Sequence, residues 1–278
     1  MTQNFSERLQ AVIAEYSSLC VGIDPHPHLL ESWGLRCDVT GLRTFSRQVV
    51  AACRGRVGIV KPQVAFYEQF GSDGFAVLEE TIGALREAGI IVIADAKRGD
   101  IGSTMQGYAR AWLDPHAALS SDAVTVTPFM GFHALDPVVD LAEEHARGVF
   151  VLAATSNPEA RYLQNFSDEA GLSVSQHIVD EVGKWNAGHH QGQLGVVLGA
   201  TLEKLPDITN LGGPILMPGV GAQGASFADV ARLVAGSTAV AVPNVSRAIL
   251  QAGPNEADLR AAIEQQVAAN QAASQAAC

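Results

Sequence analysis

The sequence predicts an α/β protein folded as one (β/α)8 barrel, or TIM barrel, over residues 1–278. Short apolar runs rich in Val, Ile and Leu recur eight times along the chain, and such continuous runs are typical of parallel strands buried on both faces. Segments with apolar spacing near 3.6 residues separate most of them. Eight strand–helix units fit a domain of about 250 residues. An open, doubly wound sheet is the alternative architecture.

The elements follow from these patterns in chain order. A helix over about 5–16 precedes the first strand, and a low-complexity tail over about 268–278 is expected to fray. The predicted strands cover 19–23, 57–61, 90–97, 123–127, 148–154, 194–200, 214–218 and 238–243. The predicted helices cover 41–53, 74–89, 136–147, 173–186 and 226–236, and the second ends at a glycine, a common helix stop. Residues 156–193 are long for one connection and predict an elaborated loop after the fifth strand.

Composition excludes several classes of partner. The formal net charge of −11 disfavours nucleic acid and anionic membranes. The apolar runs are too short to span a bilayer, and the N-terminus lacks the apolar core of a signal peptide. The four cysteines show no metal-binding spacing, so we expect reduced thiols in a cytoplasmic protein.

Charged residues end three consecutive predicted strands. Asp95 and Lys97 stand two apart on the third strand and therefore face the same side, with Asp100 in the next turn. Lys61 ends the second strand and Asp24 the first. Catalytic groups of such barrels lie at the carboxyl ends of the strands, where these residues meet. An ion-pair network that only closes the barrel is the alternative, but such a network adds little stability.

The alternation of lysine and aspartate has a chemical consequence. A lysine flanked by carboxylates stays protonated, because opposite charges favour the ammonium form. A charged lysine is a poor nucleophile and a good proton donor. The pattern therefore favours general-acid or electrostatic catalysis over a Schiff base.

Two later segments predict a phosphate site. The glycine-rich stretch 217–226 follows the seventh strand, contains Gln223 and leads into a helix that starts near Ser226. Arg247 follows the eighth strand at the start of the next helix. Loops after strands seven and eight commonly bind phosphate in these barrels, through backbone N–H groups and arginine.

Taken together, "DAKRGDIGST" with Lys61 upstream, "PGVGAQG" and "NVSRAI" closely resemble the orotidine 5′-phosphate decarboxylase family, in its longer bacterial branch. The resemblance runs from "VGIDPHP" to Arg247. It implies a homodimeric (β/α)8 barrel that converts orotidine 5′-monophosphate to UMP and CO2 without a metal or an organic cofactor.

The resemblance also implies the role of each catalytic residue. Lys97 would stabilise the C6 carbanion and then protonate it, and Asp95 would lie beside the leaving carboxylate. Lys61 would bridge Asp95 and the ribose hydroxyls. Asp100 would reach into the partner subunit's site.

The residues that would bind substrate surround this group. Asp24 would bind the ribose, Thr104 would lie near Asp100, and Ser156 would read the pyrimidine edge. Ser246 stands where many members have glycine, but its backbone N–H can serve equally. The phosphate end would comprise Pro218, Gln223, Ser246 and Arg247.

Two other functions remain open from the sequence. A keto-sugar-phosphate decarboxylase or hexulose-phosphate synthase shares the DxKxxD strand but uses magnesium, and it usually has an acid in place of Lys61. A non-catalytic barrel would bind nucleotides without turnover. Magnesium-independent turnover separates the main hypothesis from both.

Overall fold

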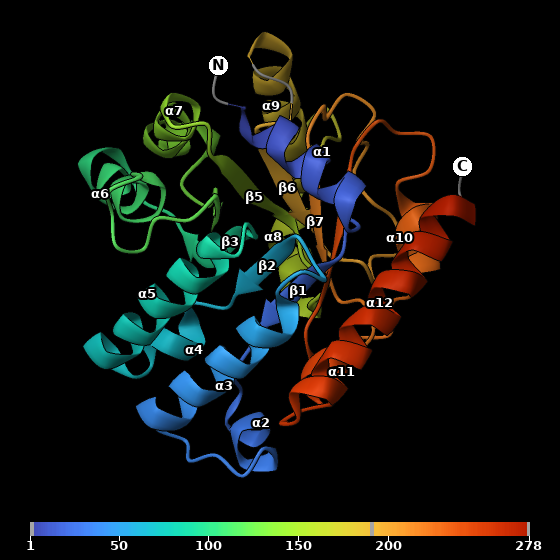
Figure 1. Cartoon of the computed structure of the whole chain (residues 1–278). Helices are drawn as coiled ribbons and strands as arrows, with labels where there is room; N and C mark the ends of the chain where they lie inside the picture. Colours follow the sequence, from blue (N-terminus) through green and yellow to red (C-terminus); the bar gives the residue numbers. More distant parts are fainter. Residues whose placement is uncertain (1–2, 190–191, 277–278) are drawn as a thin grey trace.

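Eight parallel strands form a closed barrel in sequence order, in a computed structural model that describes residues 3–189 and 192–276 (Figure 1). The predicted (β/α)8 fold is therefore confirmed, and the open sheet is wrong. The strands are β1 (Cys20–Ile23), β2 (Ile59–Pro62), β3 (Ile91–Arg98), β4 (Ala123–Val126), β5 (Gly148–Ala154), β6 (Leu194–Leu198), β7 (Ile215–Pro218) and β8 (Ala241–Val245).

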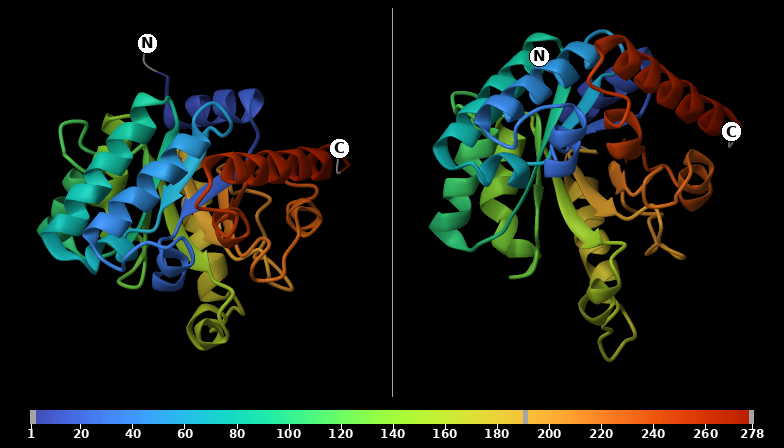
Figure 2. Two further views of the ribbon diagram at one scale, coloured as in Figure 1. Left: turned by 60° about the horizontal axis from the view of Figure 1, so that its bottom comes forward. Right: turned by 90° about the horizontal axis from the view of Figure 1, so that it is seen from below.

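Helices surround the barrel (Figures 1 and 2). In chain order they are α1 (Phe5–Glu15), α2 (Pro27–Ser32), α3 (Val39–Cys53), α4 (Ala65–Glu68), α5 (Gly71–Glu87), α6 (Gly102–Leu113), α7 (Asp136–Glu144), α8 (Arg161–Gln164), α9 (Val174–Gly188), α10 (Phe227–Leu233), α11 (Arg247–Leu250) and α12 (Glu256–Ala276). Two 3-10 turns, η1 (Phe132–Leu135) and η2 (Pro158–Ala160), precede α7 and α8.

The structure differs from the sequence prediction at several segments, one of which is α6, a helix that was not predicted. The segment 256–276 is helical to Ala276 instead of fraying from about residue 268, because α12 packs along α3 and α10 and buries Leu259 and Ile263. The last strand covers Ala241–Val245 instead of 238–243, so Asn244 lies inside it. The second strand covers Ile59–Pro62 instead of 57–61, so Pro62 belongs to the strand and pairs with Ile23 of β1.

The core has two layers. Apolar side chains such as Ile59, Ile93 and Phe150 fill the barrel interior, and a larger set packs between the strands and the helices. Helix α1 lies across the end at which the strands begin (Figure 1). Its Phe5 and Leu9 are buried against the interior layer, so α1 closes that end and leaves the opposite rim for the site.

The segment between β5 and α9 projects beyond this rim (Figure 2). It contains η2, α8 and a short bridge between Ser167 and Ser173. This arrangement is the elaborated connection that the sequence predicted. Tyr162 of α8 is 91% exposed.

Candidate active site

A cavity of about 200 Å³ opens at the carboxyl ends of the strands. Leu152, Val197 and Leu216 give it an apolar wall. Eight residues singled out from the sequence line it together, from the rims of β1, β2, β3, β7 and β8: Asp24, Lys61, Asp95, Lys97, Pro218, Gln223, Ser246 and Arg247.

The Asp95 carboxylate is the centre of the charged group. Its Oδ2 accepts hydrogen bonds from Lys61 Nζ at 2.7 Å and Gln63 Nε2 at 2.9 Å. Its Oδ1 accepts from Lys97 Nζ at 2.5 Å and Thr125 Oγ1 at 3.0 Å. Four donors thus hold both carboxylate oxygens, and two of them, Lys61 and Lys97, were singled out from the sequence.

Burial and charge act in opposite directions on these groups. Burial alone would raise the pKa of Asp95, but the charges of Lys61 and Lys97 outweigh it and hold that pKa well below its usual range. Burial alone would lower the pKa of Lys61, but the charges of Asp95 and Asp24 outweigh it and raise that pKa. Both groups are therefore ionised at neutral pH.

The two lysines differ in exposure. The Lys61 side chain is 4% exposed, whereas that of Lys97 is 44% exposed toward the cavity. Lys61 is therefore held within the ion-pair group, and Lys97 is the ammonium group that a ligand can contact.

Asp24 brings a second carboxylate to the cavity. Its Oδ1 is buried, and no hydrogen-bond partner lies within the part of the chain that the structure describes. A buried carboxylate oxygen without a partner is costly, so a hydroxyl-bearing ligand would improve its environment.

The glycine-rich loop after β7 is folded tightly. Gly219 has φ +111°, and a Cβ there would lie 3.1 Å from Gln223 Oε1. Gln223 Oε1 accepts a hydrogen bond from Ser156 Oγ at 3.1 Å, which joins the loops after β5 and β7. Gln223 is thereby held at the rim of the cavity.

The helix after this loop starts near Ser226, as predicted, but its N-terminus lies outside the cavity. Ser226 is the N-cap of α10, and its hydroxyl accepts from the Asp229 N–H while Asp229 accepts from Ser226. The helix N-terminus is satisfied internally and does not line the cavity. The groups at this end of the cavity that could bind an anion are therefore those of the 219–223 loop, Ser246 and Arg247.

Ser246 and Arg247 reach the cavity because β8 lies closely against β1. A Cβ on Gly22 would lie 1.9 Å from Ser246 Oγ, so only glycine permits this approach. Arg247 starts α11 and is partly buried on the cavity wall.

Three predicted residues do not line this cavity. Thr104 is exposed on α6, and Asp100 lies in the turn before it, where its Oδ1 accepts from the Ile101 N–H. Ser156 does not line the cavity, but its hydroxyl donates a hydrogen bond to Gln223, which does. Ile101, the residue after Asp100, is 60% exposed, and Phe129, after β4, is 74% exposed.

Arg98 belongs to the same charged run but has another role. Its guanidinium lies over the rings of Tyr108 and Trp112 and donates to Glu68. It therefore fastens α6 and α4 to the end of β3 instead of facing the cavity.

Three polar residues of the site were not singled out from the sequence. Gln63 and Thr125 bond to Asp95, and Asn244 lines the cavity and donates to the Cys20 carbonyl. Thr125 and Asn244 are polar side chains within otherwise apolar strands, which is the signal that could have found them. Gln63 stands two residues after Lys61 and so shares its face.

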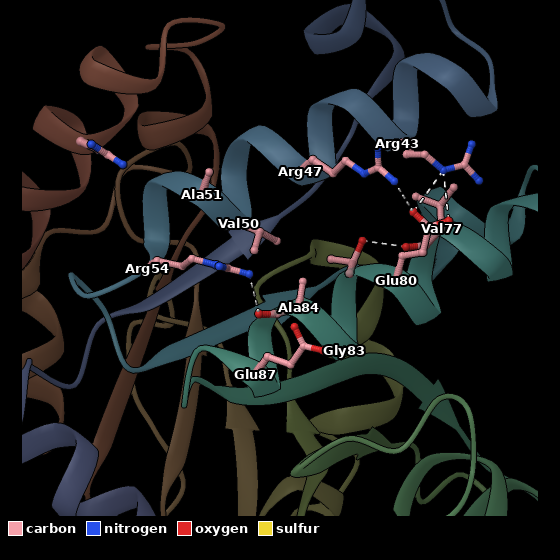
Figure 3. A pocket seen from close by; sticks show the side chains of 12 residues that line it. Arg43, Arg47, Val50, Ala51, Arg54, Val77, Glu80, Gly83, Ala84 and Glu87 are labelled. Carbon is pink, nitrogen blue, oxygen red and sulfur yellow. Dashed lines mark hydrogen bonds and ion pairs between the residues drawn. The ribbon is translucent and has the colours of Figure 1, made fainter.

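A larger cavity, of about 590 Å³, lies outside the barrel between α3 and α5 (Figure 3). Arg43 and Arg47 reach across it to Glu80, and Arg54 donates to the Ala84 carbonyl. Ala51 and Gly83 are among the residues that line it. These arginines already have partners on the facing helix, so the groove is an ion-paired helix contact.

The described residues contain no group of three or more His, Cys, Asp or Glu side chains that could hold a metal ion. Within the same residues, no helix is long and apolar enough to cross a membrane.

Fold and site together define a class: a (β/α)8 barrel enzyme with an alternating lysine–aspartate group beside a loop pair suited to phosphate. The chain belongs to the orotidine 5′-phosphate decarboxylase / HUMPS family, whose model matches residues 17–262.

Relatives agree with this assignment along nearly the whole chain. An orotidine 5′-phosphate decarboxylase of Corynebacterium efficiens is 58% identical over 96% of this chain and 97% of its own. One from Corynebacterium glutamicum is 57% identical over 95% and 96%. A Streptomyces avermitilis crystal structure, provisionally described as the same enzyme, matches with a TM-score of 0.95 at 45% identity, covering 99% of this chain and 97% of that one.

Proposed function

We propose that the protein decarboxylates orotidine 5′-monophosphate to UMP and CO2, the last step of de novo pyrimidine synthesis. One observation carries the proposal furthest: Lys97 Nζ projects into the cavity while Asp95 Oδ1, 2.5 Å away, holds it in place. The relatives named for this reaction support it along 95% or more of the chain.

The chemistry of the reaction requires such a charge. Breaking the bond from C6 to the carboxylate leaves an electron pair in an sp² orbital in the ring plane, where the ring carbonyls cannot delocalise it. A preorganised ammonium beside C6 stabilises this carbanion and then gives it a proton. We assign that role to Lys97, and Asp95 and Lys61 position it without any metal or organic cofactor.

The phosphate end supplies binding energy remote from the reacting bond. Arg247, Gln223 and the backbone around Pro218 and Ser246 would hold the phosphate, Asp24 the ribose and Ser156 the pyrimidine edge. The binding energy of the phosphate contacts can stabilise a closed conformation of the loop 217–226, which excludes water from the site.

Asp100 and Thr104 enter the proposal through a second subunit. They lie outside the cavity of their own chain, and the intervening Ile101 is exposed, as is Phe129 after β4. A homodimer that covers these apolar side chains would carry Asp100 to the partner's cavity. The cytoplasm is the proposed location, and the free thiols of Cys20, Cys37 and Cys53 are consistent with it.

The magnesium-dependent reaction is less favoured. Lys61 Nζ lies 2.7 Å from Asp95 Oδ2, so an ammonium group occupies the side of the carboxylate that a cation would need. Two lysines on one carboxylate fit a carbanion route better than an enediolate on a metal.

The deciding experiment incubates EDTA-treated protein with orotidine 5′-monophosphate and follows UMP by mass spectrometry. The wild type is expected to form UMP, and Lys97→Ala is expected to form none above background while remaining folded. A folded wild type that binds UMP but makes none without magnesium would overturn the proposal.

A further inference from the structure

The backbone of β3 is irregular where it carries the charged group. Ile93 and Ala94 pair with Ala123 and Val124 of β4, but the next pair is Arg98 with Val126. Residues 95–97 of β3 therefore stand opposite Thr125 alone. Such a bulge redirects side chains and interrupts the ladder of backbone hydrogen bonds.

Lys97 has an unusual conformation within this bulge. Its φ is +47°, in the left-handed region that a lysine rarely adopts. A backbone of this kind persists only when its surroundings fix it, and such residues concentrate at functional sites. The bulge turns Lys97 toward the cavity.

The Thr125 hydroxyl makes both contacts that fix this geometry. It accepts a hydrogen bond from the Lys97 N–H at 2.9 Å and donates to Asp95 Oδ1 at 3.0 Å. Its side chain is 1% exposed, so water does not replace either bond. One hydroxyl therefore joins the Lys97 backbone to the carboxylate that holds the Lys97 ammonium.

We propose that Thr125 is a positioning residue for the decarboxylation: its hydroxyl fixes the left-handed backbone of Lys97 and the orientation of Asp95, and so aims the ammonium at the reacting carbon. Thr125 does not touch substrate in this role. The inference rests on the proposed function, since it concerns the geometry of the same reaction.

Loss of the hydroxyl should affect the chemical step more than binding. Thr125→Val keeps the shape of the side chain but leaves the Lys97 N–H without its acceptor. The Lys97 ammonium is then no longer held in a fixed position. The phosphate end is untouched. We expect kcat to fall at least about tenfold with KM and UMP affinity within about threefold, because small displacements of a catalytic group cost this much or more.

Conservative replacements separate the hydroxyl from mere packing. Thr125→Ser keeps the hydroxyl and should retain kcat within about threefold, whereas Thr125→Cys, a weaker hydrogen-bonding group, should behave like Thr125→Val. Thr81→Val is the matched control: Thr81 is also buried and donates to a carbonyl within α5, and it does not line the cavity. It should alter stability without lowering kcat.

The assay is steady-state decarboxylation with UMP titration and thermal unfolding on the same samples. Equal kcat in wild type and Thr125→Val would overturn the inference, and so would equal losses in Thr125→Ser and Thr125→Cys. If Thr125→Val does not fold, the Ser and Cys pair decides alone. Wild-type protein without decarboxylation would refute the proposed function instead, which the same assay shows first.

Discussion

At the scale of single residues, the site is organised around one carboxylate that holds two ammonium groups. Asp95 is nine-tenths buried and receives four hydrogen bonds, so its charge is fully compensated within the protein. Removing one member of a buried ion pair leaves the other uncompensated, which is more damaging than losing an exposed pair.

This compensation predicts a pH-dependent stability. Asp95 has a lowered pKa in the fold, so its contribution is complete above its unfolded pKa of about 4 and is lost as pH falls through the folded value. Asp95→Asn, which resembles the protonated form, should lower the free energy of unfolding by about 3–5 kcal/mol at pH 7. Urea unfolding of both proteins should show the difference shrinking below pH 4. A difference that stays constant down to pH 3 would contradict this account.

Arg247 gives a prediction about binding. Charge-assisted hydrogen bonds contribute about 1.5–3 kcal/mol, so Arg247→Ala should raise KM for orotidine 5′-monophosphate at least about tenfold. The free energy of unfolding should change little, because the side chain has no protein partner among the described residues. Arg232→Ala, an exposed arginine on α10, is the control and should leave KM unchanged. An unchanged KM in Arg247→Ala would refute the phosphate assignment.

At the scale of elements, the two ends of the barrel have separate tasks. The rim at the strand carboxyl ends carries the proposed chemistry, whereas α1 closes the other end. Phe5 is fully buried there, packed edge-on against Phe150 of β5. Stability at this end and activity at the other should therefore respond to different substitutions.

Phe5→Ala tests this separation. It should lower the free energy of unfolding by about 3–5 kcal/mol, as for other buried phenylalanines, while kcat of the folded protein stays within twofold. Phe166→Ala, which truncates a side chain that is 66% exposed, should change the stability by no more than about 0.5 kcal/mol. The measurements are denaturant unfolding and kcat at 25 °C. A large loss of kcat in folded Phe5→Ala would mean that the ends are coupled.

The sequence predicted those elements that a short stretch of residues defines by its own pattern. Every strand was found, because each is an apolar run, and the spacing of Asp95 and Lys97 placed both at one rim. Helix α6 was not among the predicted helices. The full extent of α12 was also missed, because its alanine- and glutamine-rich sequence has weak amphipathic character and packing on α3 and α10 defines it. Thr125 was missed because its importance arises from the β3 bulge, which depends on pairing between strands.

At the scale of the whole molecule, the proposed site would be completed by a second chain. Asp100 follows β3 but does not line the cavity, and the next residue, Ile101, is exposed. Exposed apolar side chains beside a residue of proposed function are typical of an interface that a second copy covers.

Mixing inactive variants tests this arrangement. Lys97→Ala and Asp100→Ala should each be inactive alone. After dissociation and random reassociation, half of the dimers are mixed, and each mixed dimer regains one complete site, so about a quarter of wild-type activity should return. Size-exclusion chromatography checks that dimers re-form. No recovery in re-formed dimers would place Asp100 in the site of its own chain.

The hydrogen bond between Ser156 and Gln223 has a consequence for the two ends of the site. In the proposed roles these side chains recognise opposite ends of one nucleotide, and their bond leaves both able to do so: Ser156 Oγ can still accept, and Gln223 Nε2 can still donate. The loop that recognises the base therefore braces the loop that recognises the phosphate, so a displacement of either loop would disturb the recognition of both halves.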